Sequence, residues 1–351
     1  MIVAHLDLDA FYAAVEELED PSLRRVPLVV GGNPRGRGVV STANYLAREF
    51  GIHSAMSCAE AMRRCPHAVF VTPRHSVYRE YSRAVWGAVR HVVPTVERTG
   101  LDEGYLDIGG VAPDFLAARR IAEAVQAAVR GATSLSASLG VASCKVVAKV
   151  ASDWRKPAGL TVVPAGREAA FLAPFDVRRL PGVGPRSEER LRRAGLETIG
   201  QLAALDDDEL RHLLPGKAGR MLHDRARGID PRGLEHSVER VSVSNEETFE
   251  QDVGDTAVLH AELRRMAERL AEHLSSRGEA ARTITTKVRY PDFAIRSRST
   301  TLAAGVDDAD TIGDVACGLL DRALRDRAGP LRLVGVGLSN IEPYRQLALT
   351  P

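Results

Sequence analysis

Two adjacent carboxylates, Asp102 and Glu103, lie in the segment 101–107, which shows no helical period. Neighbouring side chains of a flat strand point to opposite faces, so a regular strand would separate the two acids. A sharp turn, which Gly104 permits, would direct both acids at one place. A third acid, Asp7, comes near the end of the first predicted strand. We expect these three carboxylates to meet in space and to hold two metal ions.

Tyr45 and Arg48 are candidates for binding an anion. They stand three residues apart in a predicted helix that follows a strand over residues 39–42, so both lie on one helix face. A hydroxyl and a guanidinium placed in this way could clamp an anion, although the same pair is also common on ordinary surfaces. Asp9 precedes a predicted helix over residues 11–18, and we interpret it as the N-cap in preference to a metal ligand.

A glycine-rich turn at residues 181–184, Pro-Gly-Val-Gly, precedes a predicted basic helix over residues 187–194. Two glycines expose backbone N–H groups beside a helix N-terminus, and such a turn grips a phosphate oxygen without reading a base. The pattern predicts a helix–hairpin–helix. A second, looser copy is expected at residues 216–220.

Basic residues are concentrated near the C-terminal end. Between Arg277 and Arg298, six basic residues against two acids leave a local charge of +4. The stretch could face phosphates or could be the solvated face of a strand, and charge alone leaves both readings open. The six basic residues are Arg277, Arg282, Lys287, Arg289, Arg296 and Arg298.

The chain has 351 residues, which predicts two to four domains, and its net charge of +1 indicates no partner. Its four cysteines are scattered without metal-binding spacing, as is typical of a reducing compartment. The sequence shows neither a signal peptide nor an apolar run of membrane-spanning length. These features predict a cytoplasmic protein.

The expected elements follow the order βαββαβ over the first half of the chain, which favours a ferredoxin-like sheet with residues 26–72 inserted as a subdomain. Composition changes at Pro164, where a helical region begins. Residues 232–240 are polar and lack an apolar period, so we expect a linker there. Beyond it the pattern predicts a final α/β unit.

Taken together, these segments resemble the Y-family DNA polymerases, in particular the bacterial DNA polymerase IV branch of translesion enzymes, over essentially the whole chain. The resemblance rests on five blocks in order: Asp7-Leu8-Asp9-Ala10-Phe11-Tyr12, residues 41–48 (STANYLAR), residues 101–107 (LDEGYLD), Lys145 to Pro157, and residues 181–184 (PGVG). It implies an α+β multidomain, right-hand polymerase. The expected parts are a palm (1–17 and 74–163), fingers (18–73), a helix–hairpin–helix thumb (164–231), a linker (232–240), a little finger (241–342) and a clamp-binding tail (343–351).

The resemblance implies template-directed, low-fidelity DNA synthesis past damaged bases. Asp7 and Asp102 are expected to bridge two Mg²⁺ ions, Glu103 to serve the ion at the primer 3′-hydroxyl, and the Leu8 carbonyl to complete the nucleotide ion. Mg²⁺ prefers hard oxygen ligands and keeps several waters, so a few carboxylates suffice. The sequence contains no separate acidic cluster of the kind that a proofreading exonuclease would need.

The resemblance also assigns the ligands of the incoming dNTP. They are Thr42, Tyr45, Arg48, Lys156 and the backbone N–H groups around Phe11 and Tyr12. Tyr12 occupies the position whose ring blocks a ribose 2′-hydroxyl, although the same ring could equally serve core packing.

Primer–template DNA is the expected partner, bound by a monomer with no membrane attachment. The residues expected to contact DNA are Gly182, Gly184, Arg186, Lys217, Arg282, Lys287, Arg289, Arg296 and Arg298. The tail residues Gln346, Leu347 and Leu349 resemble a clamp-binding peptide, against the alternative of an idle tail.

This sequence departs from the family pattern at three positions. Gly100 and Gly104 stand where relatives commonly have Ser and Ala, and Cys144 replaces a usual Asn. We expect the two glycines to loosen the acidic turn. Two alternative functions stay open: a non-catalytic DNA-binding factor, and a nucleotide cyclase with a similar two-metal palm.

Overall fold

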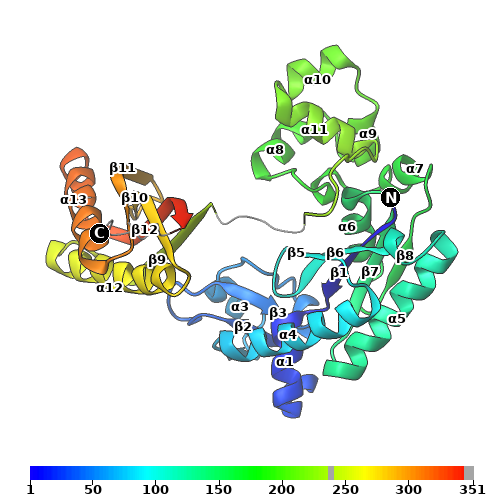
Figure 1. Cartoon of the computed structure of the whole chain (residues 1–351), viewed down its shortest axis with the longest axis horizontal. Helices are drawn as coiled ribbons and strands as arrows, with labels where there is room; N and C mark the ends of the chain where they lie inside the picture. Colours follow the sequence, from blue (N-terminus) through cyan, green and yellow to red (C-terminus); the bar gives the residue numbers. More distant parts are fainter. Residues whose placement is uncertain (236–240, 344–351) are drawn as a thin grey trace, which may run out of the picture. The chain divides into compact units, whose positions relative to one another are not determined.

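The computed structural model describes residues 1–235 and 241–343, and the chain divides into two compact units, Met1–Ser237 and Val238–Pro351. Figure 1 shows the helices and strands of both units. Each unit has hydrophobic cores of its own. Within the described residues, no helix is both long and apolar enough to cross a membrane.

A five-stranded sheet forms the centre of the first unit, in the order β5-β6-β1-β7-β8. Only β7 and β8 are parallel neighbours in this sheet, and its other pairs are antiparallel. The strands are β1 (Val3–Leu8), β5 (Val96–Arg98), β6 (Glu103–Asp107), β7 (Ala137–Ala142) and β8 (Leu160–Val162). With α4 (His75–Val92) and α5 (Phe115–Thr133), the order β1–α4–β5–β6–α5–β7 confirms the expected ferredoxin-like arrangement.

The two faces of this sheet differ because side chains alternate along each strand. From β1, Ala4, Leu6 and Leu8 are buried in a core with α1 (Phe11–Glu19), α4 and α5. His5 lies on the opposite face, where its Nδ1 is 2.8 Å from Ser152 Oγ of α6 (Lys145–Trp154). Asp7, two residues on, therefore also belongs to the face that α6 covers.

The insertion between α1 and α4 forms a small subdomain with its own core. Its strands lie in the order β3-β2-β4, with β2 antiparallel to β3 and parallel to β4. The elements are η1 (Pro21–Arg25), β2 (Leu28–Gly31), β3 (Val40–Ala43), α2 (Tyr45–Arg48), α3 (Cys58–Arg64) and β4 (Val69–Val71).

Short helices follow β8 and share one core with α6. Leu172, Leu191 and Leu202 from these helices are fully buried. The elements are α7 (Glu168–Leu172), η3 (Val177–Arg179), α8 (Pro185–Arg193), α9 (Ile199–Ala203), α10 (Asp207–Leu213) and α11 (Lys217–Ala226). The helical region that the composition predicts after Pro164 is thereby confirmed.

A buried ion pair joins β5 to α6 and also holds part of the expected linker. Lys145 Nζ lies 2.6 Å from Glu97 Oε2, and both residues are buried. The same carboxylate accepts a 2.8 Å hydrogen bond from the backbone N–H of Glu235, and Lys145 donates to the Gly233 carbonyl at 3.3 Å. Since a buried charge is stable only when paired, this contact fixes the chain to the first unit as far as Glu235.

The second unit is a four-stranded antiparallel sheet in the order β11-β10-β12-β9, with α12 and α13 packed on one face (Figure 1). The elements are β9 (Ser242–Val253), α12 (Thr256–Ser275), β10 (Glu279–Arg289), β11 (Ile295–Val306), α13 (Ala309–Asp326) and β12 (Leu331–Pro343). These elements confirm the α/β unit that the sequence predicts beyond the linker. The domain boundaries expected from the sequence are finer than the division into two units, and they stay a prediction.

Candidate active site

The pairing of β1 with β6 brings the three candidate acids to one end of the sheet. Asp7 and Glu103 are direct partners across this antiparallel pair. Asp102 lies in the bend just before β6, and its carbonyl accepts a 3.0 Å hydrogen bond from the Leu8 N–H. The bend replaces the flat strand that would have turned the neighbouring acids to opposite faces.

Positive groups from α6 and the turn after it contact two of these acids. Lys156 Nζ lies 2.7 Å from Asp7 Oδ1 and 2.7 Å from Asp153 Oδ1. Glu103 forms an ion pair with Lys149. His5, on the same face of β1 as Asp7, places its Nε2 3.3 Å from Glu103 Oε2.

Burial disfavours the charged form of two of the three acids. It raises the pKa of Asp7 to about 6, against the opposing effect of Lys156. Burial also raises the pKa of Asp102, and the charge of Glu103 adds to the increase. By contrast, a hydrogen bond with His5, reinforced by Lys149, holds the pKa of Glu103 at about 2. A further cation near Asp7 and Asp102 would therefore stabilise the charged forms of these two partly buried carboxylates.

The chemistry of these donors fits a hard divalent cation, since carboxylate oxygens are the ligands that Mg²⁺ prefers. The raised pKa values of Asp7 and Asp102 fit the same conclusion, because a bound cation would stabilise both carboxylates. Within residues 1–235 and 241–343, however, no three His, Cys, Asp or Glu side chains are grouped closely enough to hold a metal ion. In the structure the Lys156 ammonium group contacts the Asp7 carboxylate, and the Lys149 ammonium group contacts the Glu103 carboxylate.

The interpretation of Asp9 as an N-cap is wrong. The N-cap of α1 is Ala10, in a left-handed conformation with φ of 47°. The buried Asp9 carboxylate instead accepts hydrogen bonds from the Ser136 and Ser138 hydroxyls and, at 2.8 Å, from the Ala158 N–H. Asp9 therefore fixes the turn that follows Lys156.

The candidate anion ligands Tyr45 and Arg48 lie on α2, as the spacing predicts. The Arg48 guanidinium lies 4.9 Å from the centre of the Tyr45 ring, and its Nε donates to the Ala43 carbonyl at 2.9 Å. The Tyr45 hydroxyl is buried and has no hydrogen-bond partner among the described residues. Burial, followed by the charge of Asp9, raises its pKa to about 12.

A hollow of about 330 Å³ adjoins Tyr45 at the start of α1. Asp9, Asn44 and Pro157 contribute to its lining. Thr42 is on β3, two residues before Asn44. The hollow therefore joins three of the segments that carry the candidate nucleotide ligands, namely the start of α1, α2 and the turn after Lys156.

Phe11 and Tyr12 begin α1 directly after Ala10, which has no side chain that could cap the helix. The first N–H groups of a helix lack partners inside it and attract anions. Burial, and then the charge of Asp102, raise the pKa of Tyr12, so this ring lies within electrostatic reach of the acids. Phe11 is buried in the core, whereas Tyr12 is partly exposed.

The glycine-rich turn has the geometry of a helix–hairpin–helix. Gly182 has a φ of 104°, which side-chain-bearing residues rarely adopt, and Gly184 is the N-cap of α8. Arg186 is the second residue of α8. Arg225 of α11 donates to the Pro181 carbonyl at 2.9 Å and so holds the turn from behind.

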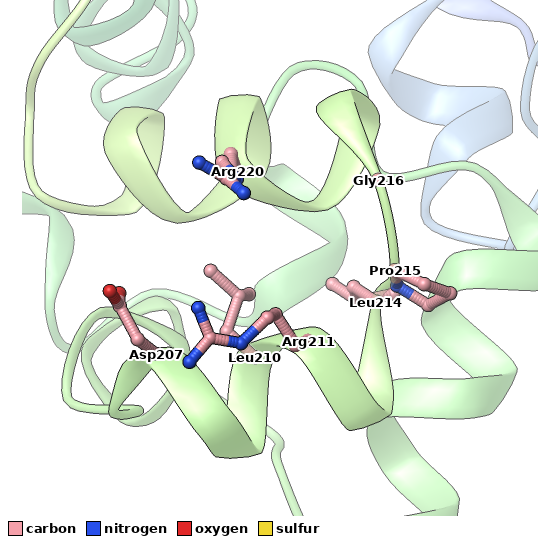
Figure 2. A pocket seen from close by; sticks show the side chains of 7 residues that line it. All are labelled: Asp207, Leu210, Arg211, Leu214, Pro215, Gly216 and Arg220. Atoms are coloured by element: carbon pink, nitrogen blue, oxygen red, sulfur yellow. The ribbon is translucent and has the colours of Figure 1, made fainter.

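The looser second copy lies between α10 and α11. Gly216 precedes α11 with a φ of 85°, and Lys217 is the first residue of the helix. Figure 2 shows the Leu210 and Arg211 side chains of α10 beside Arg220 of α11, around a hollow of about 290 Å³. None of the candidate acids or nucleotide ligands lines this hollow.

The structure does not bring the five candidate basic residues of the second unit onto one face. Lys287 and Arg289 share the face opposite the helices, where Lys287 pairs with Glu246 at 2.9 Å. Arg298 is opposite Thr286, whose hydroxyl bonds to the Ala316 carbonyl of α13. Arg298 also forms an ion pair with Asp326 of α13. Of the other two candidates, Arg296 is opposite the buried Val288, and Arg282 donates a hydrogen bond to the Leu302 carbonyl.

Gly104 faces a large side chain rather than open space. A Cβ at this position would lie 2.6 Å from the Glu97 carbonyl oxygen and 2.7 Å from the Trp86 ring. The Trp86 indole donates to the Leu101 carbonyl at 3.1 Å, and the Ser82 hydroxyl donates to the same oxygen at 2.5 Å. These bonds tie the acidic turn to α4, and the loosening expected from the two glycines stays a prediction.

Cys144, the third departure from the family pattern, is the N-cap residue of α6 and makes no side-chain capping bond. Its thiol instead donates to the Gly228 carbonyl at 3.3 Å. The cysteine thus links α6 to the chain just after α11.

The arrangement of a ferredoxin-like palm, a small inserted subdomain, a helix–hairpin–helix region and a separate α/β unit defines a right-hand polymerase. Residues 6–153 match the impB/mucB/samB family, residues 240–349 match its C-terminal domain, and residues 178–230 match the DNA polymerase-iota thumb domain. The chain belongs to this family, the Y-family of DNA polymerases. It is a DNA-directed DNA polymerase of the translesion class, whose members are metal-dependent nucleotidyltransferases.

Curated relatives match this chain over nearly its full length. The DNA polymerase IV of Streptomyces coelicolor is 42% identical over 98% of this chain and 72% of its own length. The DNA polymerase IV of Halorhodospira halophila is 42% identical over 98% of this chain and 96% of its own length.

Solved structures of the same family share the fold. A Y-family DNA polymerase chimera of Dbh and Dpo4 matches with a TM-score of 0.86 at 28% identity, covering 97% of this chain and 99% of that chain. An insertion ternary complex of Dbh DNA polymerase matches with a TM-score of 0.68 at 27% identity and the same coverage.

Sequence reasoning missed the contact of His5 with Glu103. The signal was present, since His5 and Asp7 are two residues apart on one predicted strand and must share a face. What could not be found was the partner, because it depends on the register between β1 and β6. Lys145 and Lys149 likewise lie one turn apart on α6, but Lys145 contacts Glu97 whereas Lys149 contacts Glu103.

We predict that Gly104→Ala lowers the free energy of unfolding of the first unit by about 1–3 kcal/mol, because its Cβ overlaps a backbone oxygen and the Trp86 ring. Both tryptophans of the chain, Trp86 and Trp154, are in this unit, so urea unfolding followed by tryptophan fluorescence reports on it alone. Gly100→Ala is the control, since the atom nearest to its Cβ would be Asp102 Oδ1, the end of a side chain, at 3.3 Å. Equal effects of the two substitutions would contradict the overlap.

We predict that Arg289→Ala weakens binding to duplex DNA and lowers the slope of log affinity against log salt by about 1, as for the loss of one phosphate contact. Arg298→Ala is the matched control and should leave both quantities nearly unchanged, because Arg298 is held on the helix side by Asp326. Fluorescence anisotropy over a series of salt concentrations measures both. A larger loss from Arg298→Ala than from Arg289→Ala would refute the assignment of faces.

Proposed function

We propose that Asp7, Asp102 and Glu103 hold two Mg²⁺ ions that support nucleotidyl transfer from a dNTP to a primer 3′-hydroxyl. The observation that carries this proposal is the register that sets Asp7 opposite Glu103, with Asp102 in the adjoining bend. When bound, the ions would activate the 3′-hydroxyl and neutralise charge on the leaving pyrophosphate. Asp7, Asp102 and Glu103 would supply carboxylate oxygens to the ions, Glu103 to the ion that activates the 3′-hydroxyl, and the Leu8 carbonyl would supply a further oxygen.

The triphosphate would lie among Thr42, Tyr45, Arg48 and Lys156 and against the first N–H groups of α1, at Phe11 and Tyr12. The buried, unpartnered Tyr45 hydroxyl supports this role, since it provides a donor without a partner in the described residues. Lys156 would exchange its contact with Asp7 for a phosphate oxygen. The carboxylates of Asp7 and Asp153 outweigh burial and raise the pKa of Lys156, so the group is charged at neutral pH.

Tyr12 would exclude ribonucleotides. Its ring is partly exposed at the start of α1 and is close enough to Asp102 for their charges to interact. A ring at this position can contact the sugar of a nucleotide whose triphosphate lies among Tyr45, Arg48 and Lys156.

Primer–template DNA would be held at its phosphates by Gly182, Gly184, Arg186 and Lys217. The face opposite the helices of the second unit would add Lys287 and Arg289. We further propose that the chain acts as a monomer and synthesises DNA without proofreading.

Replacing Asp102 tests the two-metal assignment. Asp102→Ala should reduce primer extension with Mg²⁺ and all four dNTPs by roughly a thousandfold, since several kcal/mol of charge stabilisation are lost. Asp107→Asn, at the other end of β6, is the matched control and should retain extension, because Asp107 only caps the turn to Gly110. Full extension by Asp102→Ala would sink the proposal, and a cyclic product formed without primer–template would favour a nucleotide cyclase.

The C-terminal residues Gln346, Leu347 and Leu349, which lie outside the described residues, would bind a sliding clamp. Tethering to a clamp raises the local concentration of primer ends. Deletion of residues 346–351 should leave extension on linear primer–template unchanged and should abolish its stimulation by a loaded clamp. If stimulation survives the deletion, the tail is not the clamp ligand.

A further inference from the structure

A buried carboxylate on α1 has no role in the site described above. Glu16 is 3% exposed, although a carboxylate in a protein core is costly unless it is paired and hydrogen-bonded. An apolar residue would fill this position of a core-facing helix without that cost. The partners of Glu16 therefore indicate what the charge is for.

Tyr78 of α4 and Arg74, the N-cap of that helix, bind this carboxylate. The Tyr78 hydroxyl donates to Glu16 Oε1 at 2.5 Å, and Arg74 donates through Nη2 to Oε2 at 2.6 Å and through Nε to both oxygens at 3.1 Å. Arg74 is the N-cap of α4, and Tyr78 lies one turn further along. Charge-assisted bonds of this kind are short and directional, so they hold the Tyr78 ring in one orientation.

Tyr78 also contacts the proposed sugar gate. Its ring is stacked on the Tyr12 ring, with centroids 4.0 Å apart and planes 14° apart. His75 meets the Tyr12 ring edge-on at 5.9 Å. Tyr12 and Glu16 are four residues apart on α1, so they share one face of the helix, and Tyr78 touches both.

The stacking limits where the Tyr12 ring can lie. Tyr78 is fully buried and anchored at its hydroxyl, so it presents a fixed flat surface to one face of the Tyr12 ring. A gate excludes a 2′-hydroxyl only while its ring is held against the sugar, and a ring free to rotate about its side-chain torsions would yield to the larger nucleotide.

We propose that Tyr78, anchored by Glu16 and Arg74, is the positioning residue that holds Tyr12 in its gating orientation and so sets the discrimination between ribonucleotides and deoxyribonucleotides. The inference rests on the proposed function of Tyr12 as the gate. Tyr78 acts through Tyr12 and does not itself contact the nucleotide.

The test is single-nucleotide insertion by the full chain on primer–template with Mg²⁺, comparing kcat/KM for a dNTP and its matching rNTP. Tyr78→Leu should raise the rNTP-to-dNTP ratio roughly three- to tenfold, the range expected for loss of one aromatic pair. Tyr78→Phe keeps the stacked ring and should raise the ratio less. An unchanged ratio with Tyr78→Leu would overturn the proposal, even if kcat fell for both nucleotides, because a purely structural role lowers both together.

Tyr81→Phe is the matched control. Tyr81 is on the next turn of α4, and its hydroxyl donates to the more exposed Glu19 at 2.8 Å, so the substitution removes the same kind of bond away from the gate. It should leave the ratio unchanged. If Tyr81→Phe raised the ratio as much as Tyr78→Leu, the effect would belong to α4 as a whole and the proposal would fail.

Tyr12→Ala separates this proposal from the one on which it rests. If Tyr12→Ala leaves the ratio unchanged, the gate assignment itself is wrong. If it raises the ratio and Tyr78→Leu does not, the gate stands and the positioning role is refuted. Because Tyr78 acts through Tyr12, Tyr78→Leu should add nothing to the ratio of Tyr12→Ala in the double variant.

Arg74→Met provides a second route if Tyr78→Leu does not fold. The Arg74 side chain is 43% exposed, so its replacement removes one anchor of Glu16 without removing a buried side chain. It should raise the ratio about twofold, and an unchanged ratio in a folded Arg74→Met variant would count against the anchor.

Discussion

The antiparallel pairing of β1 with β6 is the constraint on which the candidate active site depends. Its register sets Asp7 opposite Glu103 and His5 opposite Tyr105, because a shift of one residue would move every side chain of β1 to the other face. The bend before β6 then adds Asp102. Hydrogen bonds from Trp86 and Ser82 to the Leu101 carbonyl hold that bend, and Gly104 leaves the room that the Trp86 ring occupies.

Concentrating acids in this way requires compensating charge, and α6 with its following turn supplies it. Lys149 and Lys156 contact Glu103 and Asp7, while Lys145, one turn earlier, neutralises the buried Glu97. Lys145 and Lys149 lie one turn apart on α6, and each has an acidic partner, which explains why a largely buried helix carries these charges. Asp9 completes the arrangement by bonding to the Ala158 N–H just after Lys156. The same principle of a buried charge with a defined partner applies at Glu16, one turn after Tyr12 on α1.

Much of the fold could be predicted from periodicity. The βαββαβ order, the helical region after Pro164 and the α/β unit beyond the linker are all confirmed, because alternation with period 2 or 3.6 is a local property of the chain. Local patterns did less well where a side chain had a choice of partners. Asp9 looked like an N-cap because it precedes a helix, but the Ser136 and Ser138 hydroxyls lie 127 and 129 residues away in sequence.

The sequence by itself determined the family and the residue types that can do its chemistry, since motifs such as residues 7–12 and 101–107 are contiguous and independent of long-range packing. Only the tertiary structure decided which charges work together. Arg289 and Arg298 are equivalent in a count of basic residues, but strand register places them on opposite faces of one sheet. Likewise, Glu16 and Tyr78 are unremarkable in the sequence and become a support for Tyr12 only when α1 packs on α4. Register and helix packing depend on the summed burial of many side chains, so a local pattern does not contain them.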